Sequence, residues 1–147
     1  MVDNSTIRSI SVSTGGTEDL NAFLDQRLAE EGLTPAALAL IGFSQGAMMS
    51  LHVAPRRGQP MAGVVAISGK LMLPKLLAEE AKVKPPIMLI HGDRDDVVPF
   101  QEMQAAGNAL VAAGFATFGH VMQGTGHGIA PDGLGVAMQF LKERLPS

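Results

Sequence analysis

Three polar segments in separate parts of the chain have the residue types that nucleophilic catalysis requires. Ser44 lies in the sequence GFSQG, the acidic run HGDRDD spans residues 91–96, and His127 lies in GTGHG. A serine hydroxyl becomes an effective nucleophile when a histidine takes its proton, and a carboxylate can hold that histidine in the useful tautomer. The three segments therefore predict covalent catalysis by a serine, and their order along the chain is that of the α/β-hydrolases.

The acidic run offers more than one carboxylate. Asp95 and Asp96 are the two candidates for the residue that orients the histidine, and spacing alone does not choose between them. A Ca²⁺ loop is the alternative interpretation of this run, but it would need further oxygen ligands and a glycine at its sixth place. Val97, Val98 and Pro99 follow instead. We therefore expect no metal at this run.

The glycines around Ser44 have a physical reason. The pattern Gly-x-Ser-x-Gly is weak by itself, but here it lies between the apolar run LALI and the apparent helix that begins with AMMSLHV. A sharp turn from strand to helix brings backbone segments together, so positions 42 and 46 leave almost no room for a side chain. The amide of Gln45 would point toward a developing oxyanion. The alternatives are a structural turn at Ser44 and a capping role for His127.

Four short apolar runs predict the strands of a sheet. They are LALI at 38–41, MAGVVAI at 61–67, IMLI at 87–90 and FATFGHVM at 115–122. The first three are apolar almost throughout, which is typical of strands buried on both faces of a parallel sheet. GFSQG, HGDRDD and GTGHG follow the first, third and fourth runs. The carboxyl ends of the strands are where open parallel sheets form their sites.

Helical patterns lie between these runs. Thr17 is a candidate N-cap of a helix that ends at Gly32, Pro99 suits the first turn of a second helix that ends at Gly114, and Pro146 closes a third. The apolar positions at helical spacing are Leu20, Phe23, Leu24 and Leu28, then Met103, Ala106 and Leu110, and finally Leu134, Ala137, Met138, Leu141 and Leu145. The alternation predicts an α/β fold in a single domain, 1–147, to which residues 1–16 could add an edge strand or an arm.

The composition excludes several classes of protein. A formal net charge of −3 and the lack of any Lys/Arg cluster argue against a nucleic-acid partner, and the lack of cysteine excludes disulfides and thiolate metal sites. No apolar run approaches the roughly 18 residues that span a bilayer, and the amino end lacks the apolar core of a signal peptide. We therefore expect a cytoplasmic protein without stable membrane insertion.

From about residue 17 to residue 145 the sequence resembles the phospholipase/carboxylesterase family, the small serine esterases that include acyl-protein thioesterases. The segments that carry the resemblance are GFSQGAMM, the SGKL after the second run, PPIMLIHGDRDDVVP and GTGHGI, in this order. The resemblance implies an α/β-hydrolase-like three-layer sandwich with a short, mainly parallel sheet of about four to five strands. It also implies hydrolysis of carboxylic esters or thioesters through an acyl-serine intermediate, with no cofactor.

Carried over position by position, the family pattern assigns the site residues. The nucleophile falls on Ser44, the base on His127 and one oxyanion amide on Gln45. The acid falls on Asp95 rather than Asp96.

The family pattern is incomplete at the amino end. Family members begin with further strands, one of which leads into a His-Gly-rich loop that supplies a second oxyanion amide, and Thr14-Gly15-Gly16 lies too close to Ser44 to be that loop. An N-terminally truncated member would be a weak enzyme, since loss of one oxyanion donor typically costs about 10² to 10³ in turnover. The strand before Ser44 would also lose a neighbour. We expect Ile7–Ser13 or a second copy of the protein to cover its edge, which would favour a homo-oligomer.

Three further histidines and two apolar residues are interpreted without a role in the catalytic chemistry. His52, His91 and His120 are interpreted as packing or turn residues without a catalytic role. Leu71 and Met72 follow the second apolar run and could border a substrate pocket, although core packing is the alternative.

Two alternatives concern the chain as a whole. It could be a truncated hydrolase-like domain of residual activity that works as an oligomerising or binding module. It could also be a full esterase whose start codon was placed too late.

Overall fold

The described part of the chain forms a parallel sheet of four strands between two layers of helices. The computed structural model describes residues 17–145, and side chains from residue 22 onward. The strands are β1 (Ala39–Phe43), β2 (Gly63–Ile67), β3 (Ile87–Gly92) and β4 (Thr117–Met122), in the order β1-β2-β3-β4 with every pair parallel. All four apolar runs are thus confirmed as strands.

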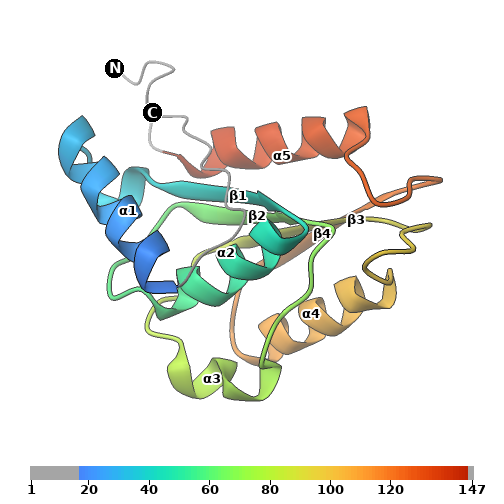
Figure 1. Ribbon diagram of the computed structural model, residues 1–147, viewed down its shortest axis with the longest axis horizontal. Helices are drawn as coiled ribbons and strands as arrows, with labels where there is room; N and C mark the ends of the chain where they lie inside the picture. Colours follow the sequence, from blue (N-terminus) through green and yellow to red (C-terminus); the bar gives the residue numbers. More distant parts are fainter. Residues whose placement is uncertain (1–16, 146–147) are drawn as a thin grey trace.

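Helices cover both faces of the sheet (Figure 1). On one side lie α1 (Thr17–Glu31), α2 (Gln45–Arg56), α3 (Leu77–Glu80) and α4 (Gln101–Ala112), and on the other lies α5 (Pro131–Arg144). Short 3-10 helices lie at Pro35–Ala37 and Pro74–Leu76. Each face has its own buried apolar cluster, and Leu40 and Leu51 belong to the larger one. The predicted three-layer α/β fold is therefore confirmed.

The helical predictions are right for the elements but wrong for some of their faces. Leu24 and Leu28 in α1 are buried as expected, whereas Phe23 is exposed. In α5 the large apolar side chains of Leu134 and Met138 are exposed. The buried residues are Gly133, Ala137, Phe140 and Leu141, with Leu145 just after the helix. A single sheet face covers only a narrow stripe of each helix, so apolar residues beside that stripe stay exposed. Thr17 and Leu20 lie outside the described side chains.

The helix boundaries follow the expected signals within two residues. The helix predicted to start at Pro99 begins at Gln101, and it ends before Gly114, whose φ of 91° only glycine adopts readily. Met103 packs against the core from α4, while Ala106 and Leu110 are buried in it.

β1 lies at one edge of the described sheet. The two residues that flank β1 bond to β2: Leu38 O accepts from Ala62 N, and Ser44 N donates to Ile67 O. The even-numbered residues therefore turn their backbone groups toward β2. In a parallel pair the alternate residues turn their amides the other way, so the N–H and C=O groups of Ala39, Ile41 and Phe43 face outward. Within residues 17–145 no strand pairs with this side. The expected cover, Ile7–Ser13, lies outside the described residues.

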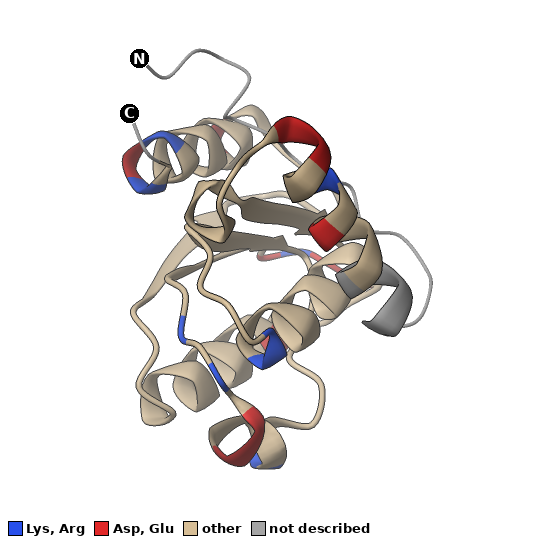
Figure 2. Ribbon diagram, turned by 90° about the vertical axis from the view of Figure 1, so that its left-hand side faces the viewer, with Lys and Arg blue, Asp and Glu red and all other residues tan. Residues whose placement is uncertain are grey.

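The charged residues are mixed rather than gathered by sign. Figure 2 shows acidic and basic residues close together on α1 and at the end of α5. In α1, Arg27 lies near Glu30. In α5, Lys142 and Arg144 flank Glu143 in the sequence. Among the helices of the described range, none is long and apolar enough to cross a membrane.

The larger apolar cluster provides a test of the fold. Leu40 in β1 is fully buried, so we expect Leu40→Ala to lower the free energy of unfolding by about 2–5 kcal/mol through lost burial and a cavity. Val111 on α4 is 61% exposed, and Val111→Ala should change it by no more than about 0.5 kcal/mol. Urea unfolding measures both variants. Equal losses for the two would contradict the described core.

Candidate active site

Ser44 occupies a tight turn between β1 and α2. Its backbone has φ 57° and ψ −116°, outside the regions that residues with side chains favour, and α2 begins at the next residue. A Cβ on Gly42 would meet the backbone of Gly46 and lie 2.7 Å from the Ala47 nitrogen. This contact gives the physical reason for the first glycine of GFSQG. The turn leaves the Ser44 side chain partly exposed at the carboxyl edge of the sheet.

The structure brings the three predicted side chains together. His127 lies in the loop between β4 and α5, with its Nε2 3.0 Å from Ser44 Oγ and its Nδ1 2.8 Å from Asp95 Oδ2. A carboxylate accepts, so Nδ1 donates to Asp95 and Nε2 is left to accept from the serine hydroxyl. The His127 side chain is 17% exposed and the Asp95 side chain is fully buried. The imidazole is thus reachable, and the carboxylate is shielded from water.

Asp95, rather than Asp96, contacts the histidine. Its Oδ1 accepts the backbone N–H groups of Val97 and Val98 at 2.9 and 2.8 Å, while Asp96 is exposed. Burial by itself would raise the pKa of Asp95, but hydrogen bonds from His127 and from the amides of Val98 and Val97 outweigh it, so the pKa lies below its ordinary value. Asp95 is therefore ionised at neutral pH.

The loops that carry Asp95 and His127 pack directly on each other. Asp93 Oδ1 accepts the Gly124 N–H at 2.8 Å, and the Arg94 N–H donates to Thr125 O at 3.0 Å. A Cβ on Gly92, at the end of β3, would meet the carbonyl oxygens of Thr125 and Gly126. Glycine at this position lets the His127 loop lie against the strand.

The backbone amide of Gln45 lies at the start of α2, directly after Ser44. Gln45 is the first residue of α2, and the first N–H groups of a helix have no acceptor within the helix. Its side chain is exposed. An anion near Ser44 Oγ would therefore lie close to the positive end of a helix.

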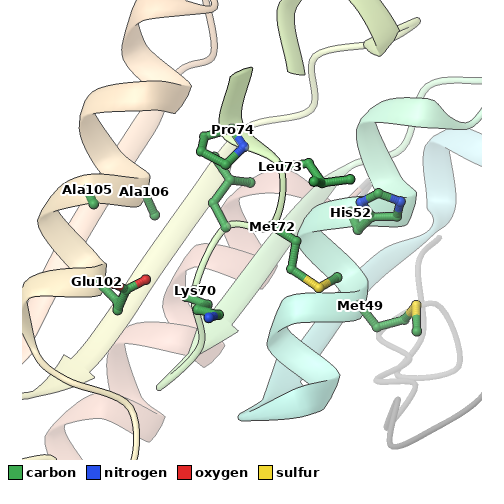
Figure 3. Close-up of a pocket in the computed structure, with 10 residues that line it drawn as sticks. Met49, His52, Lys70, Met72, Leu73, Pro74, Glu102, Ala105 and Ala106 are labelled. Atoms are coloured by element: carbon green, nitrogen blue, oxygen red, sulfur yellow. The ribbon is translucent and has the colours of Figure 1, made fainter. Parts of the chain in front are cut away.

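Leu71 and Met72 line a cavity of about 790 Å³ between α2, the loop after β2 and α4. Figure 3 shows Met49 and His52 on one side of it, Met72 and Leu73 on the loop, and Glu102 on the α4 side. Leu71 is also part of the buried core, and its role beside a substrate pocket stays a prediction. The lining does not include Ser44, Asp95 or His127. The cavity lies near the Ser44 turn, since its Lys70 follows Gly69, and a Cβ on Gly69 would lie 3.3 Å from Ser44 O.

Two aromatic or basic neighbours of the site were missed by sequence reasoning. The Phe43 ring lies 4.9 Å from the His127 ring, and His91 Nε2 lies 3.3 Å from Asp95 Oδ2. Their positions directly before Ser44 and four residues before Asp95 were visible in the sequence, but the contacts depend on how the turns fold.

The remaining histidines lie away from these contacts. His120 bonds to Asp132 at 2.6 Å and thereby holds the pKa of this exposed carboxyl below its ordinary value. Burial lowers the pKa of His52, and the nearby charge of Arg56 adds to this effect. In the described part of the chain, no three His, Asp or Glu side chains gather as metal ligands would.

A parallel sheet with a serine at a strand-to-helix turn and a histidine after the last strand defines the α/β-hydrolase fold. Residues 9–145 match the phospholipase/carboxylesterase family, and the chain belongs to this family.

Relatives of the chain are considerably longer than the chain itself. It is 30% identical over 128 residues to acyl-protein thioesterase 1 of Gibberella zeae, covering 84% of this chain and 54% of that protein. It is 32% identical over 117 residues to esterase YpfH of Escherichia coli, covering 80% of this chain and 49% of that protein. The crystal structure of esterase PE8 superposes with a TM-score of 0.84 at 45% identity, covering 88% and 62%. The chain thus spans about half the length of the curated relatives it matches.

The contact at Gly92 predicts a steric effect on stability. We expect Gly92→Ala to lower the free energy of unfolding by about 1–3 kcal/mol or more. The new methyl group would overlap the backbone of Thr125 and Gly126, which cannot move aside as a flexible side chain could. Gly128, beside His127, has open space around it, so Gly128→Ala is the matched control and should change stability by less than about 1 kcal/mol. Thermal and urea unfolding measure both. A neutral Gly92→Ala would show that the two loops do not pack in this way.

The lowered pKa of Asp95 predicts a pH-dependent contribution to stability. A carboxyl whose pKa is lower in the folded chain stabilises the fold above its unfolded pKa of about 4, and this contribution is lost as the pH falls through the folded pKa. We expect Asp95→Asn to be less stable than the unchanged chain at pH 7, with a difference that shrinks as the pH falls below about 4. Urea unfolding at a series of pH values measures it, with the exposed Asp96→Asn as control. A difference that is constant down to about pH 2 would exclude this contribution.

Proposed function

We propose that the chain is a serine hydrolase that cleaves carboxylic esters or thioesters through an acyl-Ser44 intermediate. The observation that carries the proposal is the pair of hydrogen bonds from Ser44 Oγ to His127 Nε2 and from His127 Nδ1 to Asp95 Oδ2. Membership of the phospholipase/carboxylesterase family supports it. The relatives named above are called thioesterase and esterase, which gives the class of substrate.

The first half of the reaction transfers the acyl group to the enzyme. Ser44 Oγ attacks the carbonyl carbon while His127 Nε2 takes the hydroxyl proton, and the carbonyl oxygen becomes an oxyanion. The Gln45 N–H would donate to this oxyanion. Asp95 stabilises the imidazolium without taking its proton. His127 then gives the proton to the departing alcohol or thiol as the carbon–oxygen or carbon–sulfur bond breaks.

The second half releases the acid. A water molecule attacks the acyl-Ser44 carbonyl carbon while His127 takes one of its protons, and the new oxyanion again lies near Gln45. Collapse breaks the bond to Ser44 Oγ, which regains a proton from His127. The product is a carboxylic acid, and every proton is supplied and returned by the same imidazole. This sequence of steps uses no cofactor.

The cavity beside Leu71 and Met72 is the proposed place for the acyl part of the substrate. Its walls are mainly apolar, and Lys70 connects it along the chain to the segment that packs on the Ser44 turn. A mostly apolar cavity with few polar groups suits an aliphatic chain. Glu102 and Lys70 are the charged residues of its lining.

A second candidate function follows from the outward-facing amides of β1. Within residues 17–145 the outer edge of β1 has no partner strand, and such an edge is a place where another strand can add. The chain would then be an oligomerising or binding module with residual activity, and a homo-oligomer is the form this edge favours. The cytoplasm remains the predicted location.

Labelling with a fluorophosphonate tests the hydrolase proposal. We expect attachment to Ser44 and turnover of p-nitrophenyl esters, and we expect Ser44→Ala to abolish the label and to lower kcat by about 10⁴-fold or more. Mass spectrometry of the labelled peptide locates the attachment.

Ser50→Ala is the matched control, because Ser50 lies buried within α2, the helix that begins directly after Ser44. This variant should keep both the label and the turnover. A folded sample with neither label nor turnover would favour the binding module over the hydrolase.

A further inference from the structure

His91 reaches the Asp95 carboxylate from within the sheet. Its side chain is 2% exposed, and its Nε2 lies 2.9 Å from Val98 O and 3.3 Å from Asp95 Oδ2. It is therefore a buried polar group that contacts both the backbone and the side chain of the loop that carries Asp95. The steps of the proposed reaction do not use it.

The neighbours of His91 settle which of its nitrogens carries a proton. Val98 O can only accept, so Nε2 must be protonated and donate to it. The same N–H lies close to Asp95 Oδ2, which also accepts from His127 Nδ1. Asp95 Oδ1 accepts two amides. The carboxylate is thus surrounded by donors, and it has little freedom to rotate.

His91 is held in place by the sheet and by a neighbouring aromatic ring. It lies in β3, opposite Val121 of β4, and the preceding Ile90 accepts a hydrogen bond from Ser68 N. The Phe100 ring packs edge-on against the imidazole at 6.0 Å. The His91 N–H can therefore restrain the Asp95 carboxylate, which lies in a loop, relative to β3.

We propose that His91 is a positioning residue that holds the Asp95 carboxylate in the orientation it needs to bond His127. The inference rests on the proposed function, because orientation of Asp95 matters for turnover only if His127 acts as the base. His91 does not touch the reacting atoms. It acts through Asp95, by restraining both the turn at Val98 and the oxygen that faces His127.

Two substitutions separate positioning from simple packing. His91→Leu replaces the imidazole with an apolar side chain of similar size and so removes the N–H. His91→Gln keeps an amide N–H near the position of Nε2. For His91→Leu we expect kcat per fluorophosphonate-reactive site to fall about tenfold with KM unchanged, and for His91→Gln we expect most of this loss to be restored. Counting reactive sites removes the contribution of unfolded protein.

A readout without turnover accompanies the kinetics. The ¹⁵N chemical shifts of the His127 ring, in histidine-labelled protein, report the bond from Nδ1 to Asp95. We expect these shifts to change in His91→Leu and to stay close to those of the unchanged chain in His91→Gln. If the unchanged chain shows neither label nor turnover, the proposed function fails, and the shifts still decide whether His91 positions Asp95.

The outcomes that would overturn the proposal are distinct. A His91→Leu variant with unchanged kcat and unchanged His127 shifts would show that Asp95 needs no second histidine. A His91→Gln variant as impaired as His91→Leu, in both readouts, would show that only the shape of the ring matters. If His91→Leu does not fold, His91→Asn replaces it, because its shorter amide does not reach Val98 O.

Discussion

The packing of the β4–α5 loop on the end of β3 is the contact on which the geometry of the site depends. Gly92 leaves room for the backbone of Thr125 and Gly126, and hydrogen bonds from Gly124 to Asp93 and from Arg94 to Thr125 close the same junction. These contacts are between backbone segments or short side chains. They therefore fix the distance between two loops more narrowly than contacts between long side chains would.

The strands could be predicted because burial on both faces leaves a simple signature. Residues such as Leu40, Val64 and Ile90 must be apolar wherever they point, so the runs read correctly from sequence alone. The faces of the helices were harder to predict. Periodicity shows which residues share a side, but not how wide a stripe the sheet covers, and for this reason the exposure of Phe23 and Leu134 was not predicted.

The site was predictable in its residue types and less so in its contacts. Ser44 and His127 stand out because each follows a strand and lies among glycines. The preference for Asp95 over Asp96 needed a family resemblance, since the turn in which Oδ1 accepts two amides has no clear sequence signal. The contact of His91 was missed because its N–H reaches across the loop, a distance that spacing along the chain does not give.

The backbone conformation of Ser44 has a consequence for the stability of the fold. A residue with a side chain at φ 57° and ψ −116° typically costs about 1–3 kcal/mol, and glycine would adopt this conformation with little penalty. If Ser44 is the nucleophile, as proposed, the stability of the fold and catalysis favour different residues at this one position. A serine in this turn lowers the stability of the fold but keeps a hydroxyl in place. Selection for stability alone would therefore favour the replacement of Ser44 by glycine.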